Sequence, residues 1–260
     1  MFSRVLSLIA LLLLSPALLA KPFDHEHTAW SELLDKHVRW IDGVASQVDY
    51  AGMAADQAAL DAYLQTLSAV TPRAYRKWSR DQQLAFLINA YNAFTIDLVL
   101  TKYPDLKSIK QIGGFFKSPW KIEIGKLLGQ PRTLDEIEHE MIREAGVFDE
   151  PRIHAAVVCA SIGCPALRTD AFTAERLEIQ LEDSIVRFLS DRSRNRLRGD
   201  DLQVSKIFDW YGDDWDDLKA FFARHAVILA DDAAGQRLIR EGAYDLDFLS
   251  YDWDLNDLSG

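Results

Sequence analysis

The stretch SRDQQLAFLINAYNAFTIDLVL, residues 79–100, predicts a helix that lies in the middle of the fold. Ser79 and Gln82 have the spacing of a capping box, and the segment after them is apolar on almost every side until Tyr103-Pro104 stops it. We therefore expect a buried central helix at about residues 80–102. At about 100° per residue its few polar side chains share one sector of the helix: Gln82, Asn89, Asn92 and Thr95.

The segments on either side of this helix alternate between helical and extended patterns. Helical spacing of apolar residues, or a capping signal, predicts five further helices: 30–41, 60–67, 134–145, 174–189 and one that begins at Asp213. Extended segments are expected at four places: 121–126, near 202–208, in the tail after Tyr244, and as a buried strand at about 153–159. The pattern predicts an α+β fold, with residues 21–260 forming a single helix-rich domain that contains a small sheet.

Residues 1–20 have the pattern of a secretory signal peptide. Arg4 precedes an apolar run from Val5 to Leu14, and the small residue Ala20 stands just before the expected cleavage point. A membrane-spanning helix needs about 20 apolar residues, which is more than this run supplies. We therefore expect a soluble exported protein, periplasmic or secreted, that does not span the membrane after cleavage.

The charge balance argues against nucleic acid as a partner. The chain has 29 Lys and Arg residues against 40 Asp and Glu residues, a formal net charge of −11. Such a surface repels phosphate backbones. A small polar ligand or a peptide is the expected partner, and the sequence does not predict the oligomeric state.

Six motifs follow one another in a fixed order along the chain: LAFLINAYNAFTI, SPWKIEI, TLDEIEHEMIR, PRIHAAVVCASIGCPALR, VSKIFDWYGDDW and YDWDLN. Together they resemble the Domain of Unknown Function 547 family, which occurs in exported bacterial proteins, over about residues 60–256. The resemblance implies a shared fold but no activity. The polar and aromatic positions that match carry no assigned roles: Asn89, Asn92, Trp120, Glu138, His139, Arg143, Arg152, His154, Cys159, Cys164, Lys206 and Tyr211.

The segment RIHAAVVCASIGCPALR, residues 152–168, holds both cysteines of the chain. A cysteine nucleophile needs a neighbouring base, and His154 is the nearest histidine in sequence. In an extended strand, however, His154 and Cys159 would point to opposite faces. We therefore expect either Cys164 with His154, if the loop folds back, or Cys159 with His139 or His225 from elsewhere.

A disulfide is the main alternative to a reactive thiol. Exported proteins usually oxidise their cysteines, and a four-residue loop containing Gly163 can bring two α carbons within the roughly 4.4–6.8 Å that a disulfide requires. So short a loop gains little from entropy, so the bridge would shape a site rather than stabilise the fold. A weaker alternative makes Ser161 the nucleophile of a GxSxG-like elbow, although the first glycine and the βαβ repeats of that fold are missing.

Other polar residues fall at positions that should be buried. Glu138 lies on the apolar face of the helix at 134–145, where a carboxylate is costly unless it is paired. Its expected partner is Arg152 or Lys206, unless it is an acid or base with a raised pKa. The amides of Asn89 and Asn92 must also find partners, either backbone groups or the polar groups of a ligand.

No metal or cofactor is predicted from these patterns. Asp252, Asp254 and Asn256 have the first spacings of a calcium loop, but the glycine at its sixth position is missing. The six histidines lack the HExxH spacing of zinc enzymes. The alternative that the sequence leaves is a zinc site assembled from distant Cys and His residues.

Two functions are consistent with the sequence. The first is a thiol-dependent hydrolase or acyl transferase, with Cys164 or Cys159 as nucleophile and His154 and Glu138 beside it. Its substrate contacts would be Asn89, Asn92, Arg152, Ser161 and Arg168. The second is a non-catalytic module that binds a ligand or partner, in which a Cys159–Cys164 disulfide shapes a loop. Polar residues concentrate around one predicted strand and its exit loop, which slightly favours the enzyme.

Overall fold

The computed structural model describes residues 22–114 and 117–259. The expected signal peptide, residues 1–20, lies outside the described residues. Within them the chain forms helices and three small separate sheets. The predicted α+β single domain is confirmed, although three sheets replace the one small sheet that the sequence predicts.

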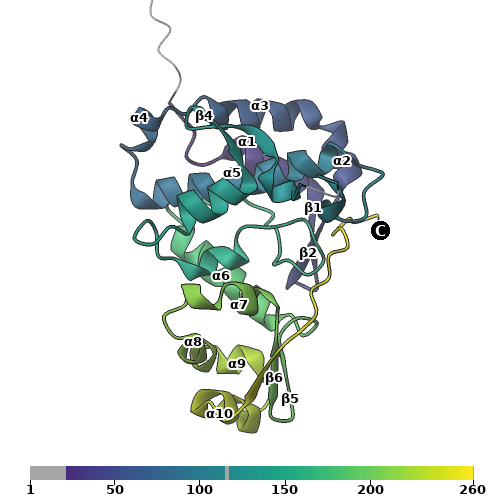
Figure 1. The fold of residues 1–260 in the computed structure, drawn as a ribbon, viewed down its shortest axis with the longest axis vertical. Coiled ribbons are helices and arrows are strands. Elements are labelled where there is room, and N and C mark those ends of the chain that lie inside the picture. Colours follow the sequence, from purple (N-terminus) through teal and green to yellow (C-terminus); the bar gives the residue numbers. More distant parts are fainter. Residues whose placement is uncertain (1–21, 115–116, 260) are drawn as a thin grey trace, which may run out of the picture.

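The central helix predicted from the sequence is α5, Arg80–Leu100, and it lies below α3 in the larger part of the molecule (Figure 1). Its capping box is present: Ser79 Oγ accepts a hydrogen bond from the Gln82 amide at 3.1 Å, and Gln82 Oε1 accepts one from the Ser79 amide at 3.0 Å. By length and composition α5 could cross a membrane, but most of it is buried inside the protein, as expected of a core helix. It ends two residues before the expected boundary.

The elements before α5 form a helical layer and one hairpin. Strands β1 and β2 pair antiparallel. The bounds are α1 Thr28–His37, β1 Val38–Ile41, β2 Ala45–Val48, α2 Tyr50–Ala55, α3 Gln57–Ser68 and α4 Pro72–Tyr75.

The elements after α5 carry most of the polar residues predicted for a site. Strands β3 and β4 form an antiparallel hairpin. The bounds are η1 Ile109–Gln111, η2 Pro119–Lys121, β3 Glu123–Leu127, β4 Gln130–Thr133, η3 Glu136–Ile142, η4 Pro151–Ala155 and α6 Leu177–Ser190.

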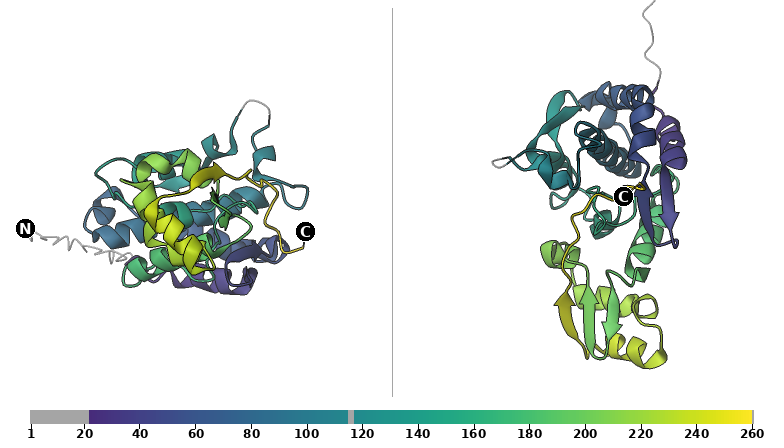
Figure 2. Two further views of the ribbon diagram at one scale, coloured as in Figure 1. Left: turned by 90° about the horizontal axis from the view of Figure 1, so that it is seen from below. Right: turned by 90° about the vertical axis from the view of Figure 1, so that its right-hand side faces the viewer.

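The last elements form a smaller helical group beside a three-stranded sheet, visible in the lower part of the right-hand view in Figure 2. In this sheet β5 and β6 are antiparallel, whereas β6 and β7 are parallel. The bounds are β5 Arg196–Arg198, β6 Asp201–Val204, α7 Ile207–Trp210, η5 Gly212–Asp214, α8 Leu218–Arg224, α9 Ala226–Leu229, α10 Ala233–Glu241 and β7 Asp245–Phe248.

Two apolar cores lie under these groups, and α6 joins them. Leu177 and Leu181 of α6 belong to the core around α5, whereas Phe188 and Leu189 belong to the core of the smaller group. After β7 the chain runs back to the larger group (Figure 1), where single bridges pair Leu255 with Ser161 and Asp257 with Val48. The two cores are therefore connected through a helix and through the returning tail.

The predicted buried strand at 153–159 is wrong. Pro151–Ala155 is the 3-10 helix η4, and the chain after it has no regular structure, although the segment is buried as expected. The reason lies on α5, where Asn92 supplies the hydrogen bonds that a neighbouring strand would otherwise make. Its Nδ2 donates to the Ala156 carbonyl at 2.9 Å, and its Oδ1 accepts from the Val158 amide at 2.9 Å.

Three predicted helices also differ from the structure. The helix expected at 30–41 ends at His37, because residues 38–41 form strand β1 and pair with β2. The helix expected at 134–145 is the π-helix Glu136–Ile142, whose start is capped reciprocally by Thr133 and Glu136. Short π-helical segments occur often at functional sites. The helix expected to begin at Asp213 is α8, and its N-cap is Asp217, whose Oδ1 accepts from the Ala220 amide at 2.9 Å.

Candidate functional site

Both cysteines are bridged, so the disulfide alternative is confirmed. Cys159 and Cys164 form the bond with their α carbons 6.2 Å apart. The amide of Cys159 donates a hydrogen bond to Sγ of Cys164 at 2.8 Å, and the hydroxyl of Tyr251 lies 3.0 Å from one sulfur and 3.2 Å from the other. In this state neither sulfur is a nucleophile.

The loop between the cysteines is held against the returning tail. Ala160 has a positive φ of 58°, which turns the chain sharply. The amide of Gly163 donates to the carbonyl of Asp252 at 2.9 Å, and a β carbon at this position would lie 2.8 Å from that same oxygen. Only glycine allows so close an approach. The tail residues that resemble a calcium loop thus use backbone groups to fix the disulfide loop.

A cavity of about 270 Å³ lies beside the disulfide. Both cysteines, His154 and Glu138 line it, so the structure brings together the four residues that the sequence predicts as catalytic. The expected obstacle, that His154 and Cys159 point to opposite faces, does not arise because the segment between them is not a strand. The remaining lining is mostly aromatic: Tyr91, Trp120, Val157, Pro165, Ile207, Trp210, Tyr211, Tyr251 and Trp253.

His154 is oriented by a carboxylate from the smaller group of helices. Its Nε2 lies 2.7 Å from Oδ2 of Asp214, and its ring stacks on Tyr211 with centroids 4.1 Å apart. Arg143 binds the same carboxylate through two hydrogen bonds of 2.6 and 2.8 Å. Asp214 and Tyr211 therefore hold the imidazole in one orientation, and Arg143 fixes the Asp214 carboxylate.

The charges in this group follow from burial and pairing. Burial alone would raise the pKa of Asp214, but the hydrogen bonds from His154 and Arg143 outweigh it and hold that pKa well below its usual range. Burial lowers the pKa of His154, although its bond to Asp214 opposes the shift. A neutral His154 therefore donates Nε2–H to the charged carboxylate. Its Nδ1, which has no hydrogen-bond partner among the described residues, is then the basic nitrogen.

Glu138 is buried as predicted, but its expected partners are wrong. Its Oε2 accepts a hydrogen bond from the Tyr91 hydroxyl at 3.0 Å, and Trp120 donates to that hydroxyl at 3.2 Å. Arg152 instead binds Glu150 and Glu178, and Lys206 pairs with Asp209. The buried Tyr91 hydroxyl thus takes the place of a cation beside the Glu138 carboxylate.

The residues predicted as substrate contacts do not line the cavity. Asn89 and Asn92 both bind backbone: the Asn89 amide exchanges hydrogen bonds of 2.7 and 3.0 Å with Phe172, as Asn92 does with residues 156 and 158. Ser161 is 1% exposed and its hydroxyl donates to the Cys159 carbonyl, so the elbow alternative finds no support.

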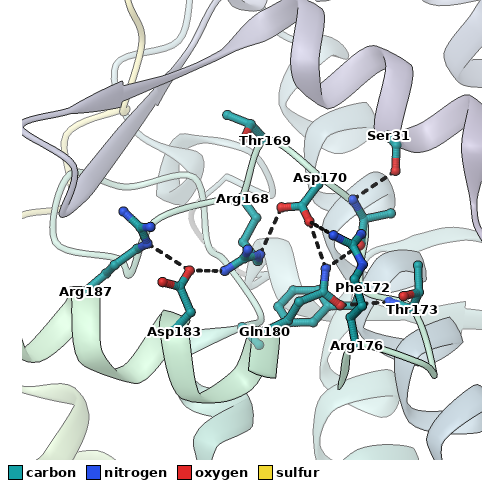
Figure 3. Close-up of polar contacts among 12 residues, drawn as sticks. Ser31, Arg168, Thr169, Asp170, Phe172, Thr173, Arg176, Gln180, Asp183 and Arg187 are labelled. Atoms are coloured by element: carbon teal, nitrogen blue, oxygen red, sulfur yellow. Dashed lines mark hydrogen bonds and ion pairs between the residues drawn. The ribbon is translucent and has the colours of Figure 1, made fainter. Parts of the chain in front are cut away.

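The two arginines predicted as substrate contacts have structural partners on α6. Arg152 binds Glu150, Glu178 and Glu182. Figure 3 shows Arg168 between the carboxylates of Asp170 and Asp183, with Gln180 binding the same loop. These contacts fix the chain against α6 both before and after the disulfide loop, so both arginines are engaged away from the cavity.

The alternative bases for Cys159 also lie elsewhere. Nδ1 of His139 faces Arg143, and His225 lies 3.6 Å from Glu182. Neither borders the cavity. His154 is therefore the histidine that lines the cavity together with both cysteines.

Four site residues have no role in the prediction from sequence because they come from distant parts of the chain: Asp214, Trp210, Tyr251 and Trp253. The aromatic residues lie close together, with Tyr251 and Trp253 centroids 4.5 Å apart and Trp210 and Trp253 centroids 5.7 Å apart. The motifs WYGDDW and YDWDLN were the available signal, because aromatic and acidic residues gather in both.

A larger cavity of about 480 Å³ borders Asp214. Its polar lining is dominated by carboxylates and includes neither sulfur, nor His154, nor Glu138. Within residues 22–114 and 117–259 no group of three or more His, Cys, Asp or Glu side chains could hold a metal ion. The smaller aromatic cavity is therefore the candidate site.

Comparison with known families gives a match over the middle of the chain. Residues 75–189 match a family described as "Protein of unknown function, DUF547". This segment includes α5, η3 and the disulfide loop, but it ends before Tyr211, Tyr251 and Trp253. Neither curated proteins nor solved structures gave a match. The chain therefore contains a DUF547 family domain over residues 75–189.

Proposed function

We propose that the protein is a binding module for a small organic cation, which occupies the aromatic cavity beside the Cys159–Cys164 disulfide. The observation that carries the proposal is the composition of the lining. Six aromatic side chains surround a single carboxylate, Glu138, and no Lys or Arg is among the described residues that line the cavity. His154 adds a neutral imidazole, because burial lowers its pKa.

Aromatic faces attract cations through the negative charge of their π systems. Each such contact contributes roughly 0.5–2 kcal/mol, and more where water is excluded. The tyrosines of the lining add no charge of their own, since burial raises the pKa values of Tyr91, Tyr211 and Tyr251. The cavity therefore favours a positively charged ligand over a neutral or negatively charged one.

The size of the cavity restricts the ligand to a small molecule. Sites for drug-sized ligands usually measure about 300–1,000 Å³, and this cavity measures about 270 Å³. Trp210, which is 43% exposed, lies where the lining reaches solvent. The disulfide supplies one wall and, through the Cys159 amide and the Tyr251 hydroxyl, keeps the loop closed against the tail.

The test compares a cation with a neutral molecule of the same shape. Tetramethylammonium chloride and tert-butanol are titrated against the native protein at constant ionic strength, with tryptophan fluorescence as the signal. We expect saturable binding of the cation and at least fivefold weaker binding of the alcohol, the ratio expected from a difference of about 1 kcal/mol. Equal affinities, or no saturable signal from the cation, would contradict the proposal.

A matched pair of variants tests the role of the carboxylate. Glu138→Gln keeps the side-chain shape and removes the charge, and it should weaken tetramethylammonium binding about tenfold, equivalent to about 1.4 kcal/mol. Glu178→Gln is the control, because Glu178 is an exposed carboxylate on α6 outside the cavity. The same loss in both variants would indicate a general charge effect and count against a site at Glu138.

A thiol-dependent hydrolase or acyl transferase is a second candidate, supported by one observation. His154, oriented by Asp214 at 2.7 Å, lines the same cavity as both sulfurs, which is the arrangement of a base beside a nucleophile. This activity requires the reduced protein. After reduction, iodoacetamide should label Cys164 at least about tenfold faster in the native chain than in His154→Ala. Equal rates would remove this candidate.

A further inference from the structure

The two sulfurs of the disulfide have unequal surroundings. Cys164 is 5% exposed, whereas Cys159 is only partly buried, and both border the cavity. Sγ of Cys164 accepts a hydrogen bond from the Cys159 amide at 2.8 Å and lies 3.2 Å from the Tyr251 hydroxyl. Sγ of Cys159 receives no backbone donor among the described residues. It lies 3.0 Å from the Tyr251 hydroxyl and 3.5 Å from the Ser161 hydroxyl, which donates its proton to the Cys159 carbonyl.

This asymmetry matters for thiol–disulfide exchange. A thiolate must reach the sulfur that it attacks, while the other sulfur leaves with a negative charge. Hydrogen-bond donors aimed at the leaving sulfur stabilise that charge, and bonds to ionised groups are about twice as strong as neutral ones. Accessibility therefore favours attack at Cys159, and the donors favour departure of Cys164.

We propose that the disulfide is an exchange site for small thiols, which attack Cys159 and release Cys164 as the thiolate. The incoming thiol first loses its proton to solvent. Its electron pair then forms a new bond to Sγ of Cys159, and the pair of the broken bond goes to Sγ of Cys164. A second thiolate of the same class attacks the mixed disulfide, which yields a small-molecule disulfide and two protein thiols. Two small thiols are oxidised and the protein disulfide is reduced.

The cavity beside the disulfide limits the substrate class. Its volume of about 270 Å³ admits a compact thiol but not a folded polypeptide. The proposal does not rest on cation binding, because it concerns the sulfurs and their donors rather than the aromatic faces. An experiment can therefore contradict thiol exchange without contradicting cation binding, and the reverse.

The position of attack is measured directly on the full oxidised chain. The protein is mixed with 2-mercaptoethanol, quenched with acid at short times and alkylated, and peptides are mapped by mass spectrometry. We expect the 2-mercaptoethanol adduct on Cys159 and the alkyl group on Cys164. The reverse pattern, an equal mixture, or a bridge that stays closed at thiol concentrations that open it in the urea-unfolded chain would overturn the proposal.

Tyr251→Phe tests the donor to the leaving sulfur while keeping the ring. The opening rate should fall about fivefold, the effect expected for loss of one hydrogen bond. Tyr244→Phe is the control, since the Tyr244 hydroxyl is buried without a partner among the described residues and lies outside the cavity. Unchanged opening in Tyr251→Phe, or equal slowing in both variants, would overturn the assigned role of this hydroxyl.

Tetramethylammonium titration and adduct mapping of the native chain separate this proposal from the proposed function. Cation binding without an adduct on Cys159 would contradict this proposal alone. Normal exchange in a protein that binds no cation would contradict the proposed function alone.

Discussion

Two aromatic clusters among residues 22–114 and 117–259 each contain a buried histidine, and they differ in what the histidine contacts. The first, the N-terminal cluster, consists of Phe23, His25, His27, Tyr63, Tyr75, Trp78 and Phe86. The second is the lining of the candidate site, which contains His154. His27 is 2% exposed and His154 is 4% exposed, so burial of the whole residue does not distinguish them.

The hydrogen-bond partners of His27 and His154 distinguish the two clusters. Nδ1 of His27 lies 2.7 Å from the Tyr63 hydroxyl, and burial lowers the pKa of His27 to about 3. His154 is bound to a carboxylate and borders a cavity. A neutral partner and close packing make the first imidazole part of the core. A charged partner and an adjacent cavity leave the second one available for a ligand or a proton.

The largest expected difference between the clusters is in stability. His27→Ala should lower the free energy of unfolding by about 3 kcal/mol, because it leaves a void among packed rings and the Tyr63 hydroxyl without a partner. His154→Ala should lower it by about 1 kcal/mol, since water can enter from the cavity and Arg143 still binds Asp214. Urea unfolding at neutral pH measures both. A larger loss in His154→Ala would reverse the comparison.

The next effect is in the pH dependence of stability. A histidine whose pKa is lower in the folded than in the unfolded chain binds its proton preferentially when unfolded, so stability falls as the pH drops below about 6.5, the pKa of histidine in an unfolded chain. For His27 this loss continues until about pH 3. His27→Gln should therefore reduce the stability lost between about pH 7 and 4.5 by about 2 kcal/mol.

His154→Gln supplies the matched comparison for this pH effect. The pKa of His154 is also lowered by burial, but the hydrogen bond to Asp214 raises it again in part. His154→Gln should therefore reduce the stability lost at acid pH by less than His27→Gln does. Urea unfolding at several pH values gives both slopes, and a steeper change in His154→Gln would mean that Asp214 does not offset burial.

The smallest effect is on ligand binding. Trp210→Leu should weaken tetramethylammonium binding about threefold to fivefold through loss of one aromatic face, while stability changes by at most about 0.5 kcal/mol because Trp210 is at the surface. Trp78→Leu should lower stability and leave tetramethylammonium binding almost unchanged. Trp78 packs against Phe23 and Phe86 with centroids 5.2 Å away in each case, so its loss affects the core of the first cluster.

Fluorescence titration and urea unfolding on both tryptophan variants complete this test. If Trp78→Leu weakened cation binding as much as Trp210→Leu, the two clusters would not be functionally distinct. If Trp210→Leu unfolded at much lower urea concentration, its ring would serve packing rather than binding.

The sequence predicted the elements whose signals are local. The capping boxes at Ser79 and Thr133 and the nearly all-apolar helix between Leu84 and Leu100 depend on neighbours in the chain, and all are present. The inward position of Glu138 followed from helical geometry alone. The disulfide was one of the alternatives because the spacing of the two cysteines permits it.

Features that depend on distant contacts could not be predicted in this way. A short apolar run such as 153–159 fits a buried strand or a buried irregular segment equally well, and Asn92 on another helix decides between them. The partner of His154 is sixty residues away in η5, and the tail reaches the site from beyond β7. Nothing in the local pattern of these segments indicates that they meet at one cavity.

The returning tail has a consequence for the order in which the site is assembled. A chain synthesised from its N-terminus exposes Cys159 and Cys164 before Tyr251 and Trp253 have been made. Until the tail arrives, the loop lacks both the Asp252 carbonyl and the Tyr251 hydroxyl that hold it. Until the tail has been made, the cysteine pair is thus held by fewer contacts, and docking of the tail afterwards fixes the bonded loop.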